Sequence, residues 1–419
     1  MDFSIFRRIF RSPAILSFII FLSVMGPGII TANVDNDAGG ITTYSLAGSQ
    51  FGYNLLWIFI PMIIALAVIQ EMGVRMGIVS GKGLADLIRE KIGIRLTFLM
   101  MIALLLANFG NVLAEFSGIA VSSGIFNVPR FIALPLAAFF VWLLVVKGTY
   151  KSVEKVFLLA SALYLSYIVA GFLAQPNWAL AAKSIIFPQI SLDPAYIIML
   201  IGLVGTTIAP WMMFYIQSSV VEKGISLKNL KYSKIDAVFG AIVVNIVAFF
   251  IVLACAATIF TQGIQVNNVA DVSIALAPLA GQYASILFAF GFLNASLFAA
   301  SILPLSTAYY VCESLGFEAG VSKSFREAPV FHGLYLLLII LAVVIIMIPS
   351  APLLSILYLS QVVNGILLPF VLILMLLIIN DRKIMRDHVN SRIFNLISIA
   401  TIIIVMSLSI GLVITSTFH

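Results

Sequence analysis

Long runs of apolar residues, separated by short polar segments, follow one another along the whole chain. A helix that crosses a membrane needs about 20 predominantly apolar residues. Eleven runs meet that length, so the pattern predicts eleven membrane-spanning helices. Their approximate limits are 14–48, 53–74, 96–124, 130–147, 153–175, 193–220, 234–260, 276–312, 331–349, 352–379 and 393–416. The first and the sixth are interrupted near the middle by polar or helix-breaking residues.

The composition agrees with a polytopic, all-helical membrane protein. Apolar residues make up 62% of the 419 residues and charged residues 10%, whereas a soluble domain has about 45–50% and about 25%. The two cysteines, Cys255 and Cys312, form neither a disulfide framework nor a metal cluster. The first apolar run lacks a small-residue cleavage site, so no cleavable signal peptide is expected. Because the loops are short, residues 1–419 are predicted to form one transmembrane domain.

The positions of the basic residues predict the orientation. With a cytoplasmic amino terminus, every one of the 23 Lys and Arg residues except Arg130 and Lys183 falls on the cytoplasmic side, as the positive-inside rule requires. The carboxyl terminus is then outside, and we expect a multi-pass protein of the cell membrane. These charges meet lipid head groups, so the excess of basic over acidic residues needs no nucleic-acid partner. No obligatory protein partner is evident either.

Three acidic residues lie at membrane depth, namely Asp35, Asp37 and Glu115, and no His, Lys or Arg lies there with them. Ionisable residues inside a membrane usually serve a function. The first two belong to the segment Asp-Asn-Asp-Ala-Gly-Gly, residues 35–40, which can unwind and turn its carbonyl groups inward. Carboxylate and carbonyl oxygens suit Mg²⁺, Ca²⁺ or Mn²⁺. The alternative is a structural kink at which Asp37 caps the second half-helix. Asp35 is expected to point elsewhere, towards an outer vestibule.

The sixth run has a matching interruption at Ala209-Pro210-Trp211, preceded by Gly202 and Gly205. Proline removes a backbone donor and bends the helix. Two broken helices in corresponding positions are typical of inverted repeats, whose breaks meet at the membrane midplane. The predicted repeats are 14–175 and 193–379, with 393–416 as an additional span.

The motifs resemble those of the Nramp family of divalent-metal transporters. The segment GPGIITANVDNDAGGITTYSLAGSQFGYNLLW, Gly26 to Trp57, is similar to the family's first-span signature, in which residues 37–40 fall on DPGN. TTIAPWMMFY, Thr206 to Tyr215, falls on the A-T-x-M-P-H motif of span 6. Residues 113–116 resemble the LAEF motif of span 3, and residues 360–369 resemble the SQV…LP pattern of span 10. The resemblance implies a LeuT-type fold of ten spans plus one, with broken helices 1 and 6.

The departures from the family pattern bear on the transported ion. Asp37 keeps the family's Asp, but Gly40 replaces Asn, Ala209 replaces Met and Trp211 replaces His. Without the thioether the site loses its soft ligand for transition metals, and the small residues leave room for water. Mg²⁺ retains several waters and binds through one or two carboxylates. The chain therefore resembles the Nramp-related magnesium transporter branch.

The resemblance also implies roles for single residues. Asp37 is the expected anionic anchor, and carbonyl groups near Val34, Gly40, Thr206 and Ala209 would complete the coordination. Gln361 would close the site as a neutral oxygen donor or form an interhelical hydrogen bond. Asn364 and Asp35 are possible accessory residues, and Trp211 fills the volume of the missing histidine. Glu115 is expected to be structural or vestibular, with contact to the ion path as the alternative.

The sequence thus predicts a transporter that carries partly hydrated Mg²⁺ into the cytoplasm. It is not an enzyme and needs no cofactor, because the divalent ion is its substrate. Trp211 and Val112 replace a histidine and an acid of the family's proton relay, so transport is expected to follow membrane potential without proton coupling. The alternatives are a proton-coupled Mn²⁺ or Fe²⁺ importer and a LeuT-type amino-acid transporter. An intramembrane acid would repel the carboxylate of an amino acid. An intramembrane enzyme or receptor is disfavoured, because no nucleophile–base pair or soluble domain is present.

Overall fold

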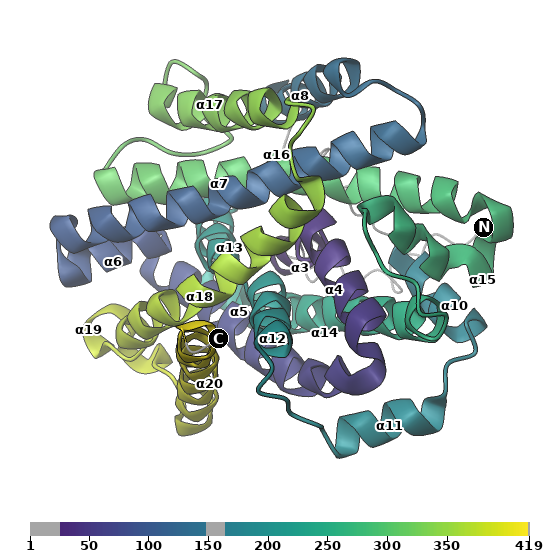
Figure 1. Cartoon of the computed structure of the whole chain (residues 1–419). Coiled ribbons are helices and arrows are strands. Elements are labelled where there is room, and N and C mark those ends of the chain that lie inside the picture. Colours follow the sequence, from purple (N-terminus) through teal and green to yellow (C-terminus); the bar gives the residue numbers. More distant parts are fainter. Residues whose placement is uncertain (1–25, 148–163, 418–419) are drawn as a thin grey trace, which may run out of the picture.

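The computed structural model describes residues 26–147 and 164–417, and these ranges contain helices and connecting turns but no strand (Figure 1). The helices up to residue 173 are α3 (Pro27–Val34), α4 (Ala38–Phe51), α5 (Phe59–Ser80), α6 (Leu84–Ile92), α7 (Ile94–Ile125), α8 (Arg130–Lys147) and α10 (Leu165–Leu173). Those that follow are α11 (Trp178–Ile186), α12 (Pro194–Thr207), α13 (Pro210–Glu222), α14 (Leu230–Cys255), α15 (Ala277–Ala280), α16 (Ala284–Leu315), α17 (Pro329–Ile346), α18 (Leu353–Ile379), α19 (Arg382–Met385) and α20 (Arg392–Thr417).

Eight helical segments in these ranges are long and apolar enough to cross a membrane. One of them, Ala38–Ser80, joins the second half of predicted span 1 to span 2 through the 3₁₀ turn η1 (Gly52–Ile58). The shorter helices α8 and α10 occupy predicted spans 4 and 5. Parts of the first and fifth predicted spans, residues 14–25 and 153–163, lie outside the described residues.

Both interruptions predicted from the sequence are breaks between helices. α3 ends at Val34 and α4 begins at Ala38, with Asp37 as its N-cap. α12 ends at Thr207, and α13 begins at Pro210, whose fixed backbone angle and missing N–H suit the first turn of a helix. The backbone groups freed at each break are therefore available inside the bundle.

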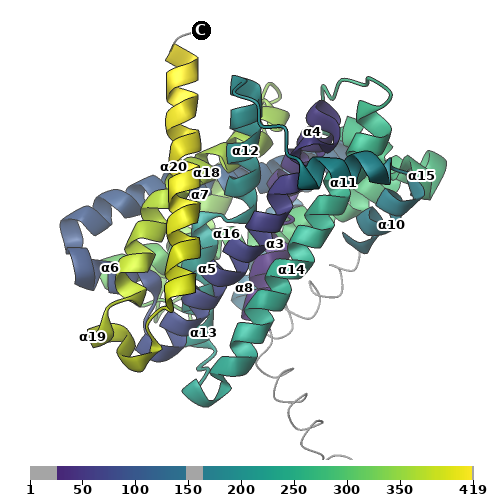
Figure 2. The ribbon, with the colours of Figure 1, turned by 90° about the horizontal axis from the view of Figure 1, so that it is seen from below.

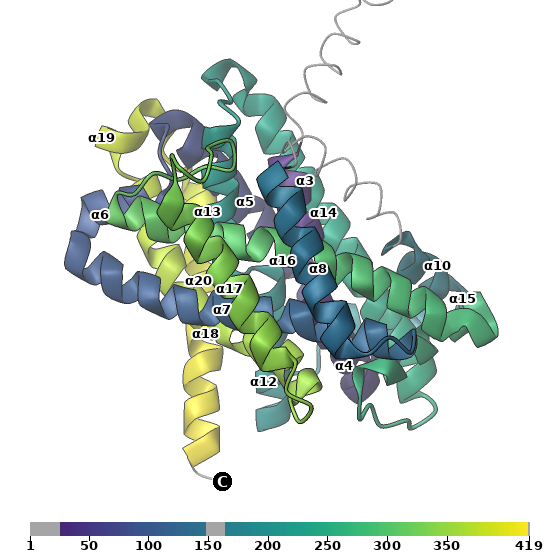
Figure 3. The same ribbon diagram turned by 90° about the horizontal axis from the view of Figure 1, so that it is seen from above.

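The broken helices lie in the middle of the bundle (Figures 1 and 2). α4 is buried along almost its whole length and contacts α7, α12, α14 and α18. α12 packs against α4 and α18, and α7 runs alongside α16. α8 and α17 cross over α7 and α16 on one side (Figure 3), and α20 stands at the edge (Figure 2). Small residues in α4 permit this close packing, which in a membrane depends on van der Waals contact between helices.

Candidate functional site

The break in the first span is shaped by Asp37. Its carboxylate Oδ1 accepts a hydrogen bond of 2.6 Å from Gly40 N–H, so the side chain caps α4 as one of the sequence interpretations anticipated. The positive end of the helix dipole faces this carboxylate. Because each carboxylate oxygen has more than one lone pair, capping leaves Asp37 able to bind a cation as well.

Three oxygens from the two broken spans converge over Gly40. A Cβ atom built on Gly40 would lie 2.3 Å from the main-chain oxygen of Asp35, 3.1 Å from Thr206 Oγ1 and 3.3 Å from Asp37 Oδ1. We call this arrangement the Gly40 cradle. Thr206 Oγ1 is buried and has no hydrogen-bond partner. The short Cβ distances show that the backbone at Gly40 is packed closely against these oxygens, with no room for a side chain. The donor set, a carboxylate, a hydroxyl and a carbonyl oxygen, is of the kind that binds hard divalent cations.

The three acids at membrane depth are buried at this break, with 1% of Asp35, 4% of Asp37 and none of Glu115 exposed. Both carboxylate oxygens of Asp35 lack a hydrogen-bond partner. Within the described part of the chain none of the three forms an ion pair. Buried carboxylates are costly unless they are protonated, paired or bound to a metal, so these acids are candidates to hold either a proton or a cation. The burial of Asp35 differs from the vestibular position expected for it.

Glu115 reaches the break from α7. Ala38 N–H donates a hydrogen bond of 3.3 Å to Glu115 Oε2, and the carboxyl groups of Glu115 and Asp37 are in hydrogen-bonding contact. Its other oxygen, Oε1, has no partner. Glu115 and Asp37 therefore both accept hydrogen bonds from the first turn of α4.

The second break places one side-chain oxygen beside Gly40, whereas the sequence interpretation expected carbonyl groups from this break to bind the ion. Thr206 supplies its hydroxyl to the cradle. The Ala209 carbonyl already accepts a hydrogen bond of 3.2 Å from Met212 N–H, and Val34 is the last residue of α3, one position before the carbonyl that lies at Gly40. Trp211 is buried, and its carbonyl accepts a hydrogen bond of 3.0 Å from Ser306 Oγ.

Gln361 approaches the break from α18. A Cβ atom on Gly39 would lie only 2.0 Å from Gln361 Nε2, so this close approach requires glycine. The Gln361 oxygen accepts a hydrogen bond of 3.1 Å from Asn364 Nδ2. The amide nitrogen therefore faces the broken helix, whereas the sequence interpretation had the oxygen face an ion. The amide nitrogen also donates to Ser360 Oγ at 3.2 Å, so both hydrogen bonds of the Gln361 side chain are made within α18 and neither is the interhelical bond of the other interpretation.

Sequence reasoning did not identify several polar residues that belong to this region. Asn108 and Asn111 on α7 join Asn364 in one hydrogen-bonded chain. The spacing of Asn108, Asn111 and Glu115 places them on one face of a helix. This spacing could have identified the two asparagines from the sequence, but only charged residues were searched for at membrane depth. Asp236 on α14 is also buried, and its carboxylate accepts a 2.7 Å hydrogen bond from Gly28 N–H at the start of α3.

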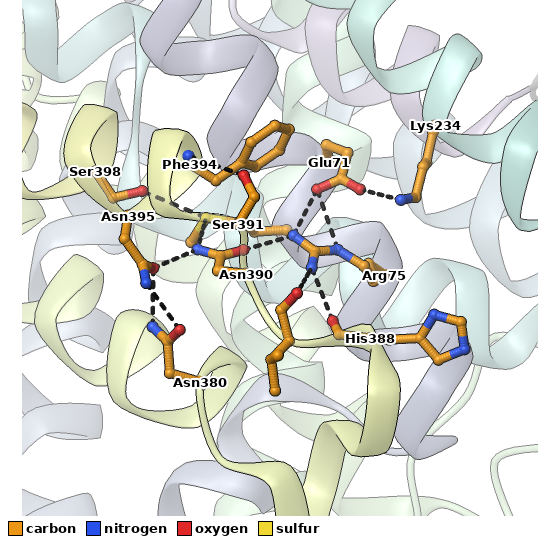
Figure 4. A network of polar contacts seen from close by, with 12 residues as sticks. Glu71, Arg75, Lys234, Asn380, His388, Asn390, Ser391, Phe394, Asn395 and Ser398 are labelled. Carbon is orange, nitrogen blue, oxygen red and sulfur yellow. Dashed lines mark hydrogen bonds and ion pairs between the residues drawn. The ribbon is translucent and has the colours of Figure 1, made fainter.

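A second polar network contains a buried acid, Glu71, that has basic partners (Figure 4). Glu71 on α5 forms ion pairs with Arg75, at 2.9 Å, and with Lys234 of α14, at 2.6 Å. Arg75 also donates to the carbonyl oxygens of His388 and Val389, at 2.8 and 3.0 Å. Basic partners thus offset the charge of Glu71. Among the described residues the acids at the break have no such partner, so their environment differs from that of a structural ion-pair network.

Comparison with known proteins identifies the family of this chain. Residues 28–415 match the family described as natural resistance-associated macrophage protein-like, Nramp. The chain is 25% identical over 404 residues to a divalent metal cation transporter MntH of Deinococcus radiodurans, covering 93% of this chain and 88% of that protein. A second MntH, from Pectobacterium carotovorum, is 25% identical over 422 residues, covering 97% and 98% of the two chains.

Solved structures confirm the predicted LeuT-type fold. The Eremococcus coleocola manganese transporter, crystallised with an aromatic bis-isothiourea compound, superposes with a TM-score of 0.76 at 23% identity, covering 93% of this chain and 85% of that one. MhsT in complex with L-phenylalanine has a TM-score of 0.59 at 16% identity, covering 92% and 97%. At these identities the likeness concerns the arrangement of helices.

Proposed function

Because the chain belongs to the Nramp family of divalent metal cation transporters, we propose that it carries Mg²⁺ in preference to Mn²⁺ or Fe²⁺. It is a multi-pass membrane transporter and not an enzyme. The Gly40 cradle is the proposed binding site, with Asp37 as its anionic anchor. The observation that supports this proposal is that three oxygens from the two broken spans gather beside Gly40, where the absence of a side chain lets them approach the backbone.

The ligand chemistry favours a hard ion. The cradle contains only oxygen atoms, and Ala209 at the second break offers no sulfur. Soft thioether ligands select transition metals, whereas carboxylate, carbonyl and water suit Mg²⁺. No group of three or more His, Cys, Asp or Glu residues within the described ranges is arranged to hold a metal ion. The ion would therefore keep part of its water shell, as Mg²⁺ usually does.

Buried acceptors around the break suit a hydrated cation. Water bound to a cation turns its hydrogens outward, so its second shell must consist of hydrogen-bond acceptors. Asn36 Oδ1, Glu115 Oε1 and the Asp35 carboxylate are buried oxygens without partners. They would accept these hydrogens, and three acids at one place would repel the carboxylate of an amino-acid substrate.

Membrane potential is the proposed driving force. One charge that crosses 100 mV gains about 2.3 kcal/mol, so a divalent ion gains about 4.6 kcal/mol. At about 1.36 kcal/mol per factor of ten, this sustains a gradient on the order of 10³. We propose uptake into the cytoplasm across the cell membrane, with the amino terminus inside and the carboxyl terminus outside. The side chains of Trp211 and Val112 do not titrate, so neither can pass a proton on by gaining and losing charge.

One observation favours a second candidate, a proton-coupled Mn²⁺ or Fe²⁺ importer. Two carboxyl groups in hydrogen-bonding contact, as Asp37 and Glu115 are, can share a proton that a cation would displace. Proton influx that accompanies metal uptake separates this candidate from uncoupled transport.

The decisive experiment measures uptake of Mg²⁺, Mn²⁺ and Ca²⁺ into proteoliposomes at a fixed potential. We expect Mg²⁺ uptake that Mn²⁺ inhibits weakly. Thr206→Val keeps the side-chain shape but removes one cradle oxygen, so the KM for Mg²⁺ should rise roughly fivefold. The matched control is Thr258→Val, a buried threonine whose hydroxyl donates to the Ala254 carbonyl. Robust Mn²⁺ uptake without Mg²⁺ uptake would refute the proposed substrate, and an unchanged KM in Thr206→Val would refute the proposed site.

A further inference from the structure

A chain of three asparagines connects Gln361 on α18, through α7, to a main-chain carbonyl on α16. Asn108 and Asn111 lie on α7 and Asn364 on α18, and all three are buried. Asn111 Nδ2 donates to Asn108 Oδ1 at 3.0 Å and to Asn364 Oδ1 at 3.2 Å. Asn364 Nδ2 donates to Asn111 Oδ1 at 2.9 Å and to Gln361 Oε1 at 3.1 Å. We call Asn108, Asn111 and Asn364 the amide ladder.

The far end of the ladder is anchored to an acceptor that cannot donate. Asn108 Nδ2 donates to the main-chain carbonyl of Leu303, at 2.8 Å, and to Thr307 Oγ1, at 2.7 Å. An amide oxygen in the same place would face the Leu303 oxygen without a proton between them. The orientation of the Asn108 amide is therefore fixed by chemistry, which resolves the usual ambiguity of amide oxygen and nitrogen.

This orientation passes from one amide to the next. Because Asn108 turns its oxygen towards Asn111, the adjacent group of Asn111 must be its nitrogen. Asn111 and Asn364 form a reciprocal pair, so the nitrogen of Asn364 is fixed in turn. Asn364 then offers an N–H to Gln361, whose oxygen must accept it. All six N–H bonds of the ladder are used, which makes its direction stable.

The direction of the ladder decides which atom of the Gln361 amide faces the proposed cation site. With its oxygen held by Asn364, Gln361 turns its nitrogen towards Gly39, the neighbour of Gly40, and this nitrogen also donates to Ser360 Oγ at 3.2 Å. Amide N–H groups repel a cation and cannot accept hydrogen bonds from its bound waters. We propose that Asn108, Asn111 and Asn364 are positioning residues that hold the Gln361 oxygen away from the cation. The ion is then bound weakly enough to be released, as transport requires.

This inference rests on the proposed cation site, and its test uses whichever divalent ion the wild-type protein transports. Asn364→Leu removes the donor that holds Gln361, and Asn108→Leu removes the anchor while leaving the Asn111–Asn364 pair. In Asn364→Leu the Gln361 oxygen loses its donor and can turn towards the ion. In Asn108→Leu the Asn364 donor remains, but the Leu303 carbonyl no longer fixes the direction of the chain, so the oxygen is released less often. We expect the KM and the dissociation constant of the ion to fall roughly fivefold in Asn364→Leu, with a lower maximal rate, and to fall less in Asn108→Leu.

Two controls separate positioning from a general packing effect. Asn245→Leu replaces a buried asparagine of α14 that bonds the Ala241 carbonyl and is not part of the ladder; its KM should stay at the wild-type value. Adding Gln361→Leu to Asn364→Leu should abolish the gain in affinity. An unchanged or raised KM in both ladder variants would overturn the inference, as would a gain that persists without Gln361. A wild-type protein that transports Mn²⁺ but not Mg²⁺ would refute the proposed substrate only, since the ladder test would then use Mn²⁺.

Discussion

Asp37 and Glu115 come from different helices, yet their carboxyl groups meet at the start of α4. Asp37 caps this helix through Gly40 N–H, at 2.6 Å, and Glu115 accepts the N–H of Ala38, at 3.3 Å. The first turn of α4 thus holds two acids side by side without a basic partner in the described part of the chain. This arrangement concentrates negative charge where the two broken spans meet, and the first predictions test its consequences.

Asp37→Asn should reduce transport of every divalent ion by at least about tenfold, because it removes the anchor charge from a low-dielectric site. The amide oxygen can still cap α4, so the protein should remain folded. Uptake of Mg²⁺ and Mn²⁺ into liposomes measures the effect, with Asp193→Asn, at an exposed N-cap of α12, as control. Wild-type uptake by a folded Asp37→Asn protein would contradict the site assignment.

Glu115→Gln should preserve Mg²⁺ uptake but raise KM several-fold. Glutamine can accept the Ala38 N–H and donate to Asp37, so the local structure is retained while one negative charge is lost. A pH-sensitive dye inside liposomes held at fixed potential should report no metal-dependent acidification in either protein. Acidification by the wild type that disappears in Glu115→Gln would instead establish proton coupling through this pair.

Ala209→Met should shift selectivity towards Mn²⁺ by supplying a thioether at the second break. Because Gly40 and Ala209 both depart from the family pattern, Gly40→Asn is the natural second change to combine with it. A Cβ atom at Gly40 would lie 2.3 Å from the Asp35 carbonyl, however, so that change would strain the break. The measurement is the concentration of Mn²⁺ that halves Mg²⁺ uptake, which should fall in the Ala209→Met variant. If competition does not change, residue 209 does not face the ion.

Arg75→Ala should destabilise the protein by on the order of 2 kcal/mol, since it leaves buried Glu71 with Lys234 alone and frees two carbonyl groups near α20. Thermal unfolding in detergent measures the loss as a lower Tm. Lys82→Ala is the control, because Lys82 and Glu90 form an exposed ion pair that contributes little. Equal effects of the two changes would mean that the network of Figure 4 carries no special stability.

The amino-acid sequence by itself determined the membrane class, the positions of the spans and the two breaks. A run of about 20 apolar residues has few alternatives to a spanning helix, and Asp37 and Pro210 interrupt two such runs with residues that begin new helices. The motifs around Asp37, Glu115 and Gln361 likewise suffice to identify the Nramp family and, with it, the LeuT-type fold.

Only the tertiary structure decided which atoms meet. Sequence spacing fixes which face of a helix a residue occupies but not which atom of a distant helix lies opposite it. The carbonyl at the Gly40 cradle is therefore that of Asp35 and not of Val34, and Glu115 touches Asp37. Gln361 turns its nitrogen inward because a carbonyl on α16, at Leu303, orients a chain of amides between them. Hydrogen-bond direction is set by the complete chain of donors and acceptors, and three separate helices supply that chain.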